Sequence, residues 1–342
     1  MGFVWDEHRS MIASLTGASV WVILATLAGS GHAPLSVIEL LLMFALLVIV
    51  PLGLALAPIV TDPGLAGFEQ TARWLQPIAA ACAVAAFWHG PGLASGLLVA
   101  PWFAMGGLVA ASGLAGLSRS RSIVECVGNV ARLDLGIAGG WLLVSRLGIP
   151  TGFQEPIVLL TAVHFHYSGF ATALIAGSGA RWTQGGRRRD WWEKTALAIA
   201  LLPFAVAAGF VFSPTLRVVA VGAFTLAIVS LAVLLALESR TLATLNARIF
   251  LRTSATVVLV GILLAAVYAI GEYTHQAWLT IPGMASTHGW MNALGFVLPG
   301  LLGWLIQFHA ELGMAPEAPV MTYANRDRTI PLAFLARDYY DR

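Results

Sequence analysis

Long apolar stretches alternate with short polar segments along almost the whole chain. Each stretch is close to the roughly 20 residues that an α-helix needs to cross the hydrocarbon core of a bilayer. The pattern therefore predicts about ten transmembrane helices. Their expected ranges are 11–29, 35–60, 75–92, 93–117, 122–147, 156–178, 192–213, 216–238, 249–271 and 286–307.

The third and fourth predicted helices share one apolar stretch, which is interrupted only by His89, Gly90, Pro91 and Gly92. Because Gly-Pro-Gly strongly breaks helices, we expect a tight hairpin at this point. The alternative is a single re-entrant segment, which would leave nine spans.

The composition excludes a soluble domain. Charged residues make up 11% of the chain and hydrophobic residues 58%, with a mean hydropathy of +0.81. A soluble domain has about 25% charged residues, so this chain cannot cover a water-facing surface. We expect an all-α, polytopic transmembrane bundle over residues 1–309 and a cytoplasmic tail over 310–342. The expected surroundings are the lipid bilayer, with no nucleic-acid partner.

The positions of the basic residues predict the orientation. If the N-terminus is inside, the inner segments hold all but three of the 19 Lys and Arg residues. The exceptions are Arg132 within a span and Arg146 and Arg217 outside. Since cytoplasmic loops are enriched in Lys and Arg, we expect an inner-membrane protein with an even number of spans and both termini in the cytoplasm.

The fifth predicted span carries Glu125, Asn129, Arg132 and Asp134. Ionisable groups within a bilayer are costly and often mark function. Glu125, Asn129 and Arg132 follow i, i+4, i+7 spacing and share one helix face, whereas Asp134 points away and should meet another helix. Arg132 is open to two interpretations, an interhelical ion pair and a functional group. Asp134 is a candidate functional acid.

The sixth predicted span contains His164 and His166, at a depth of roughly 12–15 Å. Residues two apart on a helix point about 200° from each other, so His164 shares a face with Thr161 and Tyr167, while His166 looks towards a different neighbour. A buried histidine is often a satisfied core residue. Two of them at mid-depth, beside hydroxyl groups, favour function.

The last predicted span opens with His288 and Asn292, which share a face in the outer half of the membrane. Other polar and aromatic residues lie near the same level, and they predict a polar vestibule that leads to the buried histidines. For Glu39, Glu155 and His275, ordinary interfacial solvation is the alternative. The remaining members are His89, Glu272, Trp88 and Trp290.

Two motifs resemble a known family. LTAVHFHYSGF (160–170) and HGWMNALGF (288–296) are similar to sequences of the YndJ-like family of bacterial membrane proteins. PLGLAL (51–56), APWF (100–103) and GGWLLVSRLG (139–148) are similar too. The resemblance covers roughly residues 35–300. It implies that His164, His166, Tyr167, His288 and Asn292 form one functional set, but it implies no particular activity.

These residues favour a membrane-embedded enzyme that acts on a lipophilic intermediate by acid–base chemistry, without a cofactor or a metal. Cyclisation, epoxide opening and isomerisation are suitable reactions. Asp134 is the expected acid and His164 or His166 the base, while Tyr167 and His288 complete the catalytic set. The expected substrate-binding residues are Asn292, Glu39, His89, Glu125, Arg132, Thr161, Trp88, Trp290 and Glu272.

Two other functions stay open. One is a transporter or resistance protein, which ten helices would fit, although no transporter repeat or ATP-binding loop stands out. The other is a metal- or haem-binding oxidoreductase, since imidazoles are good ligands. Closely spaced His boxes are absent from the sequence, and His166 and His288 are expected at different depths.

Overall fold

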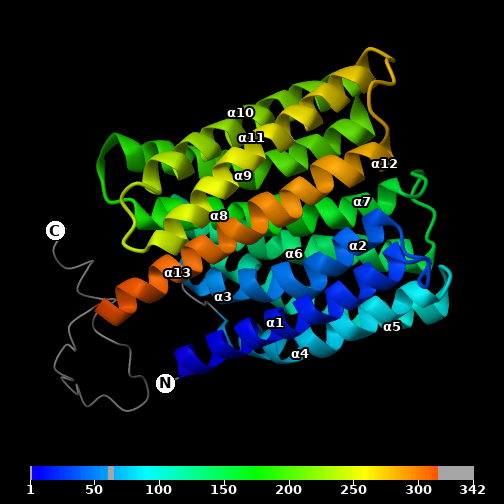
Figure 1. The fold of residues 1–342 in the computed structure, drawn as a ribbon, viewed down its shortest axis with the longest axis horizontal. Helices are drawn as coiled ribbons and strands as arrows, with labels where there is room; N and C mark the ends of the chain where they lie inside the picture. The colour runs from blue at the N-terminus through cyan, green and yellow to red at the C-terminus, as the bar shows by residue number, and fades with distance from the viewer. Residues whose placement is uncertain (1, 61–64, 315–342) are drawn as a thin grey trace.

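The computed structural model describes residues 2–60 and 65–314, and it is all-helical over this part of the chain (Figure 1). The helices join into long rods that run up and down the bundle. The rods are α1 (Gly2–Gly29); α2 (Val37–Phe44), η1 (Ala45–Ile49) and α3 (Val50–Val60); α4 (Ala66–Ala85) and η2 (Ala86–Trp88); α5 (Leu93–Leu117); α6 (Ile123–Leu147); α7 (Ile157–His164), η3 (Phe165–Ala171) and α8 (Thr172–Trp182); α9 (Gly186–Phe212); α10 (Pro214–Glu238); α11 (Leu245–Tyr273); and α12 (Ile281–Met284), η4 (Ala285–Gly289), η5 (Met291–Val297) and α13 (Leu298–Met314).

The predicted all-α polytopic bundle is confirmed. Among the described residues, nine of these rods are long and apolar enough to cross a membrane. The rod that begins with α4 is the exception, because its first half carries Glu69, Arg73 and Gln76. The predicted tail, 310–342, lies outside the described residues from 315 onward.

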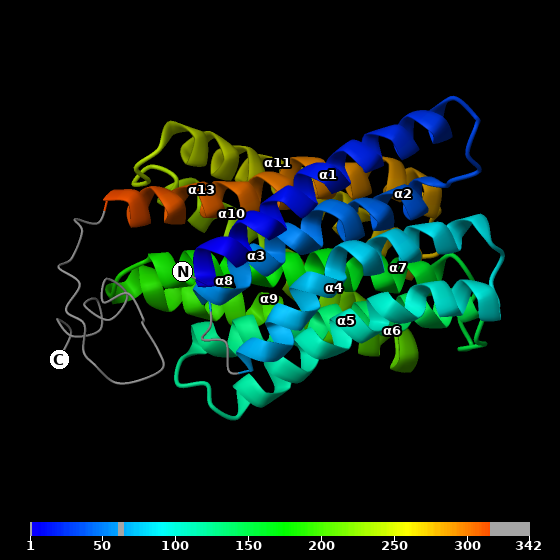
Figure 2. The same ribbon diagram turned by 90° about the horizontal axis from the view of Figure 1, so that it is seen from below.

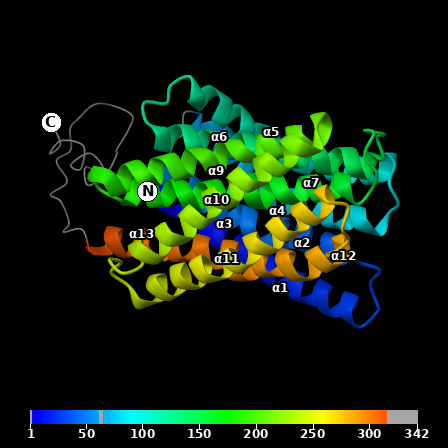
Figure 3. The same cartoon turned by 90° about the horizontal axis from the view of Figure 1, so that it is seen from above.

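The rods form two sides around a shared centre. Helices α9, α10 and α11 pack side by side at one edge, and α4, α5 and α6 pack together at the other (Figures 1 and 3). Figure 2, seen from below, brings α1, α4 and α5 to the front. The start of α1 and the end of α13 lie at the same end of the bundle.

The predicted hairpin between the third and fourth spans is confirmed. The Ser95 hydroxyl at the start of α5 donates to the carbonyls of Ala86 (2.8 Å) and His89 (3.3 Å), which closes the turn. Gly92 has φ +152°, a conformation that favours glycine. Both arms are full helices, which is inconsistent with a single re-entrant segment.

The expected start of the third span, residue 75, is wrong. Helix α4 begins at Ala66, so Glu69 and Arg73 lie within the helix and not in a cytoplasmic loop. The reason is that both charged groups find partners inside the bundle. Glu69 pairs with Arg132, and Arg73 donates to the Leu54 carbonyl at 3.0 Å.

The rod α2–η1–α3 occupies the centre. Every residue from Leu40 to Ala57 in this rod is buried within the protein. It is enclosed by α1, α4, α6, α7, α8 and α13. A helix that is apolar all round is expected to be buried in this way.

Three of the rods contain π-helical turns, and these turns meet inside the bundle. They are η1, η3, and the pair η4 and η5, and η3 packs against both η1 and η5. Because π-helical turns are rare and are frequent at functional sites, this region is the first place to look for function.

Candidate functional site

His166 lies in η3 with its side chain fully buried. Its Nδ1 is 2.8 Å from the Ala162 carbonyl, and the indole N–H of Trp102 donates to its Nε2 at 3.2 Å. A carbonyl only accepts hydrogen bonds, so Nδ1 carries the proton and Nε2 is the acceptor. The neutral ring therefore uses both of its nitrogens, and none is left for a substrate.

Asp134 lies on α6, which packs against η3. Its side chain is fully buried, and neither carboxylate oxygen has a hydrogen-bond partner among the described residues. The approach to η3 depends on Gly169, because a methyl group there would come within 2.7 Å of the Asp134 Cγ. An unpaired buried carboxylate is costly unless it holds a proton. The sequence predicted that Asp134 would meet another helix. Nothing in the sequence indicated that Gly169 would be the residue it contacts.

His164 differs from His166 although the two are only two residues apart. Its Nδ1 is 2.7 Å from the Leu160 carbonyl, so this nitrogen also carries the proton. Its Nε2 has no hydrogen-bond partner in the described part of the chain, and the side chain is exposed. As the helix geometry predicts, the two imidazoles look towards different neighbours.

His288 and Asn292 share one face, as predicted, and both lie in or beside the π-helical turns of the last rod. The Nδ1 of His288 is 2.7 Å from the Gly261 carbonyl on α11, and the Asn292 amide nitrogen is 3.0 Å from the Nε2 of His288. Gly261 allows this contact, since a methyl group there would come within 2.8 Å of the Asn292 Oδ1.

The last rod starts earlier than expected, while the depth of His288 in the membrane stays a prediction. The last rod begins at Ile281, not at 286, so His288 lies roughly 10 Å along it. His164 lies equally far from the start of its own rod, and both rods start at the same end of the bundle (Figure 1). The π-helical turns that follow them, η3 and η5, pack against each other. Thr280 as an N-cap, with Pro282 in the first turn, is the sequence signal that indicates the earlier start.

Tyr167 connects η3 to the central rod. Its buried hydroxyl donates to the Leu41 carbonyl at 2.9 Å. The Leu41 side chain in turn touches Gly289 of η4, where a methyl group would come within 2.5 Å of it. Tyr167 therefore holds the two histidine-bearing rods against α2. Thr161, by contrast, donates to Ile157 on its own helix at 2.9 Å.

Arg132 forms the interhelical ion pair that was one of its two interpretations. Its Nε is 2.7 Å from the Glu69 Oε1 on α4, and both side chains are buried. The Ser112 hydroxyl on α5 donates to the same oxygen at 2.9 Å, and Asn129 accepts from Arg132 at 3.4 Å. The result is a polar clamp across α4, α5 and α6. The sequence did not indicate Glu69 as the partner of Arg132, because the charged segment around Glu69 is typical of a loop.

The structure does not gather the remaining predicted substrate-binding residues around the histidines. Glu39 and Glu125 act at helix starts, where they accept from the backbone N–H of Ser36 (2.7 Å) and Arg121 (2.6 Å). Glu272 pairs with Arg217 at 3.4 Å. Trp290 packs edge-on against Trp21, while Trp88 and His89 line a separate cavity. The predicted vestibule stays a prediction.

No set of three or more His, Cys, Asp or Glu side chains within the described residues is arranged to hold a metal ion. His164 offers one imidazole nitrogen without a partner in this part of the chain, whereas the Nε2 of His288 faces the Asn292 amide. The candidate site is therefore the pair His164 and His288 with Asn292, framed by η3, η4 and α11.

The fold and these polar groups define the class: a polytopic helical membrane protein that carries histidines on two of its membrane-spanning rods. The YndJ-like protein family model matches residues 40–296. The chain belongs to this family, so the resemblance seen in the two histidine motifs is confirmed. The match includes every residue of the candidate site.

One curated relative is the uncharacterized membrane protein YndJ of Bacillus subtilis (strain 168). It is 35% identical to this chain over 155 residues, which are 45% of this chain and 28% of the relative. The match thus spans less than a third of the relative's length. No solved structure matches the chain significantly.

Proposed function

We propose that this protein is a membrane-embedded enzyme that acts by acid–base chemistry on a lipophilic substrate, with His164 as the proton-transferring base and His288 as its partner in holding the substrate. The observation that carries the proposal is the His164 Nε2. It has no partner among the described residues, its side chain is exposed, and it lies as far from the start of its rod as His288 does.

The backbone contacts fit this role. Each imidazole gives its Nδ1 proton to a carbonyl, of Leu160 or of Gly261, which fixes the tautomer and directs Nε2 away from the supporting helix. The Nε2 lone pair of His164 can then accept a proton from a substrate. Histidine is the commonest residue in such proton transfers. Asn292, beside His288, is suited to orient a substrate oxygen.

In this proposal His166 and Tyr167, two buried residues of η3, have a positioning role. The Nε2 of His166 accepts a hydrogen bond from Trp102, and this bond holds η3 against α5. Tyr167 is engaged by Leu41. These contacts favour His164 over His166 as the base. Suitable reactions are still those of the sequence hypothesis, which are cyclisation, epoxide opening and isomerisation.

The test starts from lipid extracts of the native host with and without this gene. A compound that accumulates in the deletion strain is offered to the purified protein in vesicles, and its consumption is followed by mass spectrometry. We expect His164→Gln and His288→Gln to abolish turnover, and His32→Gln, which alters a loop histidine, to keep it. Full turnover by both site variants would refute the proposal. A Soret band or one bound iron per chain would replace it with the metal or haem alternative.

One observation favours a second candidate, a proton-coupled transporter. Asp134 is a fully buried carboxyl group without a hydrogen-bond partner in the described residues, and it touches the π-helical turn η3. Intramembrane carboxyl groups of this kind are found in proton relays. The transporter predicts that Asp134→Asn abolishes substrate-driven proton uptake in vesicles while the transported compound stays chemically unchanged.

We also propose that the protein lies in the inner membrane, and that the end of the bundle at which α1 begins is in the cytoplasm. Arg121, Arg187, Arg188 and Arg240 lie in or beside connections at that end, and Lys- and Arg-rich loops stay in the cytoplasm. In a variant without Cys82 and Cys126, Arg187→Cys should react with an impermeant thiol reagent only after the cells are opened. His275→Cys, at the other end, should react in intact cells. The reverse labelling pattern would refute this orientation.

A further inference from the structure

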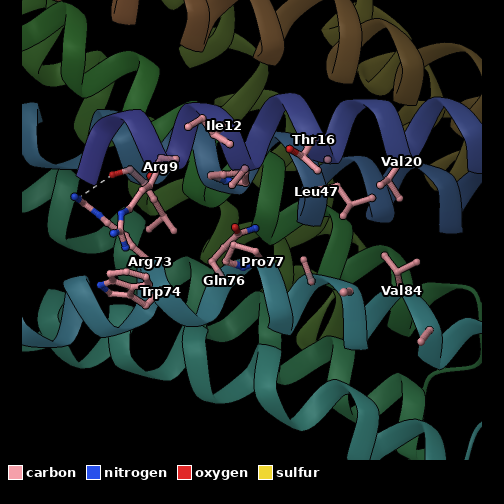
Figure 4. Close-up of a pocket in the computed structure, with 18 of the residues that line it drawn as sticks. Arg9, Ile12, Thr16, Val20, Leu47, Arg73, Trp74, Gln76, Pro77 and Val84 are labelled. Atoms are coloured by element: carbon pink, nitrogen blue, oxygen red, sulfur yellow. Dashed lines mark hydrogen bonds between the residues drawn. The ribbon is translucent and has the colours of Figure 1, made fainter. Parts of the chain in front are cut away.

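A cavity of about 870 Å³ lies between α1, the central rod and α4, away from the histidine pair (Figure 4). This volume is within the roughly 300–1,000 Å³ of typical small-molecule sites. Its walls are largely apolar and include Ile12, Val20, Leu47 and Val84. Ile12 is 61% exposed, so the cavity opens sideways at the face of the bundle that would meet lipid.

Small side chains create this groove. Gly17 of α1 packs directly on the Leu47 backbone, where a methyl group would overlap the carbonyl oxygen. This contact holds α1 against η1. Across the groove, α4 presents Ala81 and Ala85, which are exposed and line the cavity. The small side chains leave a gap between α1 and α4 that neither helix fills.

One end of the groove is positively charged. The Arg9 guanidinium stacks over the Trp74 ring at 3.3 Å from its centroid, and Arg73 lies beside them (Figure 4). Arg9 is exposed. The polar wall residue Gln76 is turned away, since its amide donates to the Leu46 carbonyl at 3.0 Å. The groove therefore has a cationic mouth and an apolar length.

The dimensions suit one fatty-acyl chain. Arg9 and Val20 both line the groove and lie roughly 16 Å apart along α1. This length is close to half of the roughly 30 Å hydrocarbon core, which is the depth of one leaflet. A guanidinium at the membrane surface attracts anionic lipid headgroups.

We propose that this groove binds one anionic membrane phospholipid, with an acyl chain between α1 and α4 and the headgroup phosphate at Arg9. The site is independent of the proposed acid–base chemistry. All of α1 lies outside the residues that match the family model, which begins at 40.

The experiment titrates the purified full chain in detergent with phosphatidylglycerol and, separately, with phosphatidylcholine, and counts bound lipids by native mass spectrometry. We expect a first phosphatidylglycerol that binds more tightly than phosphatidylcholine. Arg9→Gln should weaken this first binding event about five-fold. The matched control is Arg187→Gln, which removes an exposed arginine at the same end of the bundle and should leave it unchanged.

A second variant tests the apolar wall. Ala81→Leu fills the groove and should weaken the first binding of both lipids, whereas Ala104→Leu, at an exposed position of α5 outside the groove, should not. Equal affinity for the two lipids, or equal losses in Arg9→Gln and Arg187→Gln, would overturn the proposed headgroup site. Unchanged binding in Ala81→Leu would overturn the acyl-chain site.

Discussion

The indole N–H of Trp102 on α5 donates to the Nε2 of His166 in η3 at 3.2 Å, and both side chains are fully buried. This contact joins two rods of the bundle through side chains that are 64 positions apart in the chain. It also settles which nitrogen of His166 is the acceptor.

Removing the indole donor should destabilise the protein. Trp102→Phe leaves the His166 Nε2 buried without a partner, which costs about 1–3 kcal/mol. We expect a lower thermal unfolding temperature in detergent, measured by tryptophan fluorescence or calorimetry. Trp141→Phe changes a partly buried tryptophan of α6 and should have less effect. Equal unfolding temperatures for Trp102→Phe and the wild type would contradict the hydrogen bond.

Variants of His164 and His166 should affect different properties, since the first should change activity and the second stability. His166→Ala removes a buried ring and its two hydrogen bonds, so we expect a loss of about 2–4 kcal/mol in unfolding free energy. His164→Ala changes an exposed side chain and should alter stability by no more than about 0.5 kcal/mol. Under the proposed function, His164→Ala nevertheless loses turnover. A stable, fully active His164→Ala would count against its role as the base.

The Glu69–Arg132 pair should be strongly coupled. Replacing Glu69 leaves the Arg132 guanidinium buried without its ion-pair partner, and replacing Arg132 leaves Glu69 with the longer 3.7 Å ion pair to Arg73. Breaking a buried pair in this way costs about 3–5 kcal/mol. We expect Glu69→Gln and Arg132→Met each to lower the unfolding temperature sharply. The double variant should be more stable than the sum of the single losses predicts. Additive losses in this double-mutant cycle would show that the two side chains do not interact.

Gly169 should tolerate no side chain while Asp134 is present. Gly169→Ala puts a methyl group 2.7 Å from the Asp134 Cγ, and overpacking of this kind costs about 1–3 kcal/mol. Asp134→Ala should relieve the clash in the double variant. Gly107→Ala on α5 is the matched control, because a methyl group there meets nothing within 4 Å. Equal stability of Gly169→Ala and Gly107→Ala would contradict the close approach of α6 and η3.

The length and spacing of apolar stretches predicted most of the fold. The hairpin at Gly90–Gly92 followed from its residue types alone. Helix α4 was harder to predict, because Glu69 and Arg73 suggest a loop until their partners in other helices are known, which are Arg132 for Glu69 and the Leu54 carbonyl for Arg73. A sequence shows charges but not the partner that allows their burial.

The site was predicted in part. The residue types and the i, i+4 relation of His288 and Asn292 were visible in the sequence, and so was the divergence of His164 from His166. The hydrogen bond between Trp102 and His166 was not visible, since nothing in the sequence links two residues that lie 64 positions apart. The π-helical turns also leave no simple pattern, because one widened turn barely changes the apolar periodicity.

The buried central rod has a consequence for biogenesis. The span Val37–Pro58 leaves the ribosome before α8 and α13, although both of these later helices help to enclose it. Until α13 is inserted, the face that α13 covers must be covered by lipid tails, which are as apolar as leucine and provide no driving force for the helices to associate. The central rod is thus sealed only after helices far along the chain have entered the membrane.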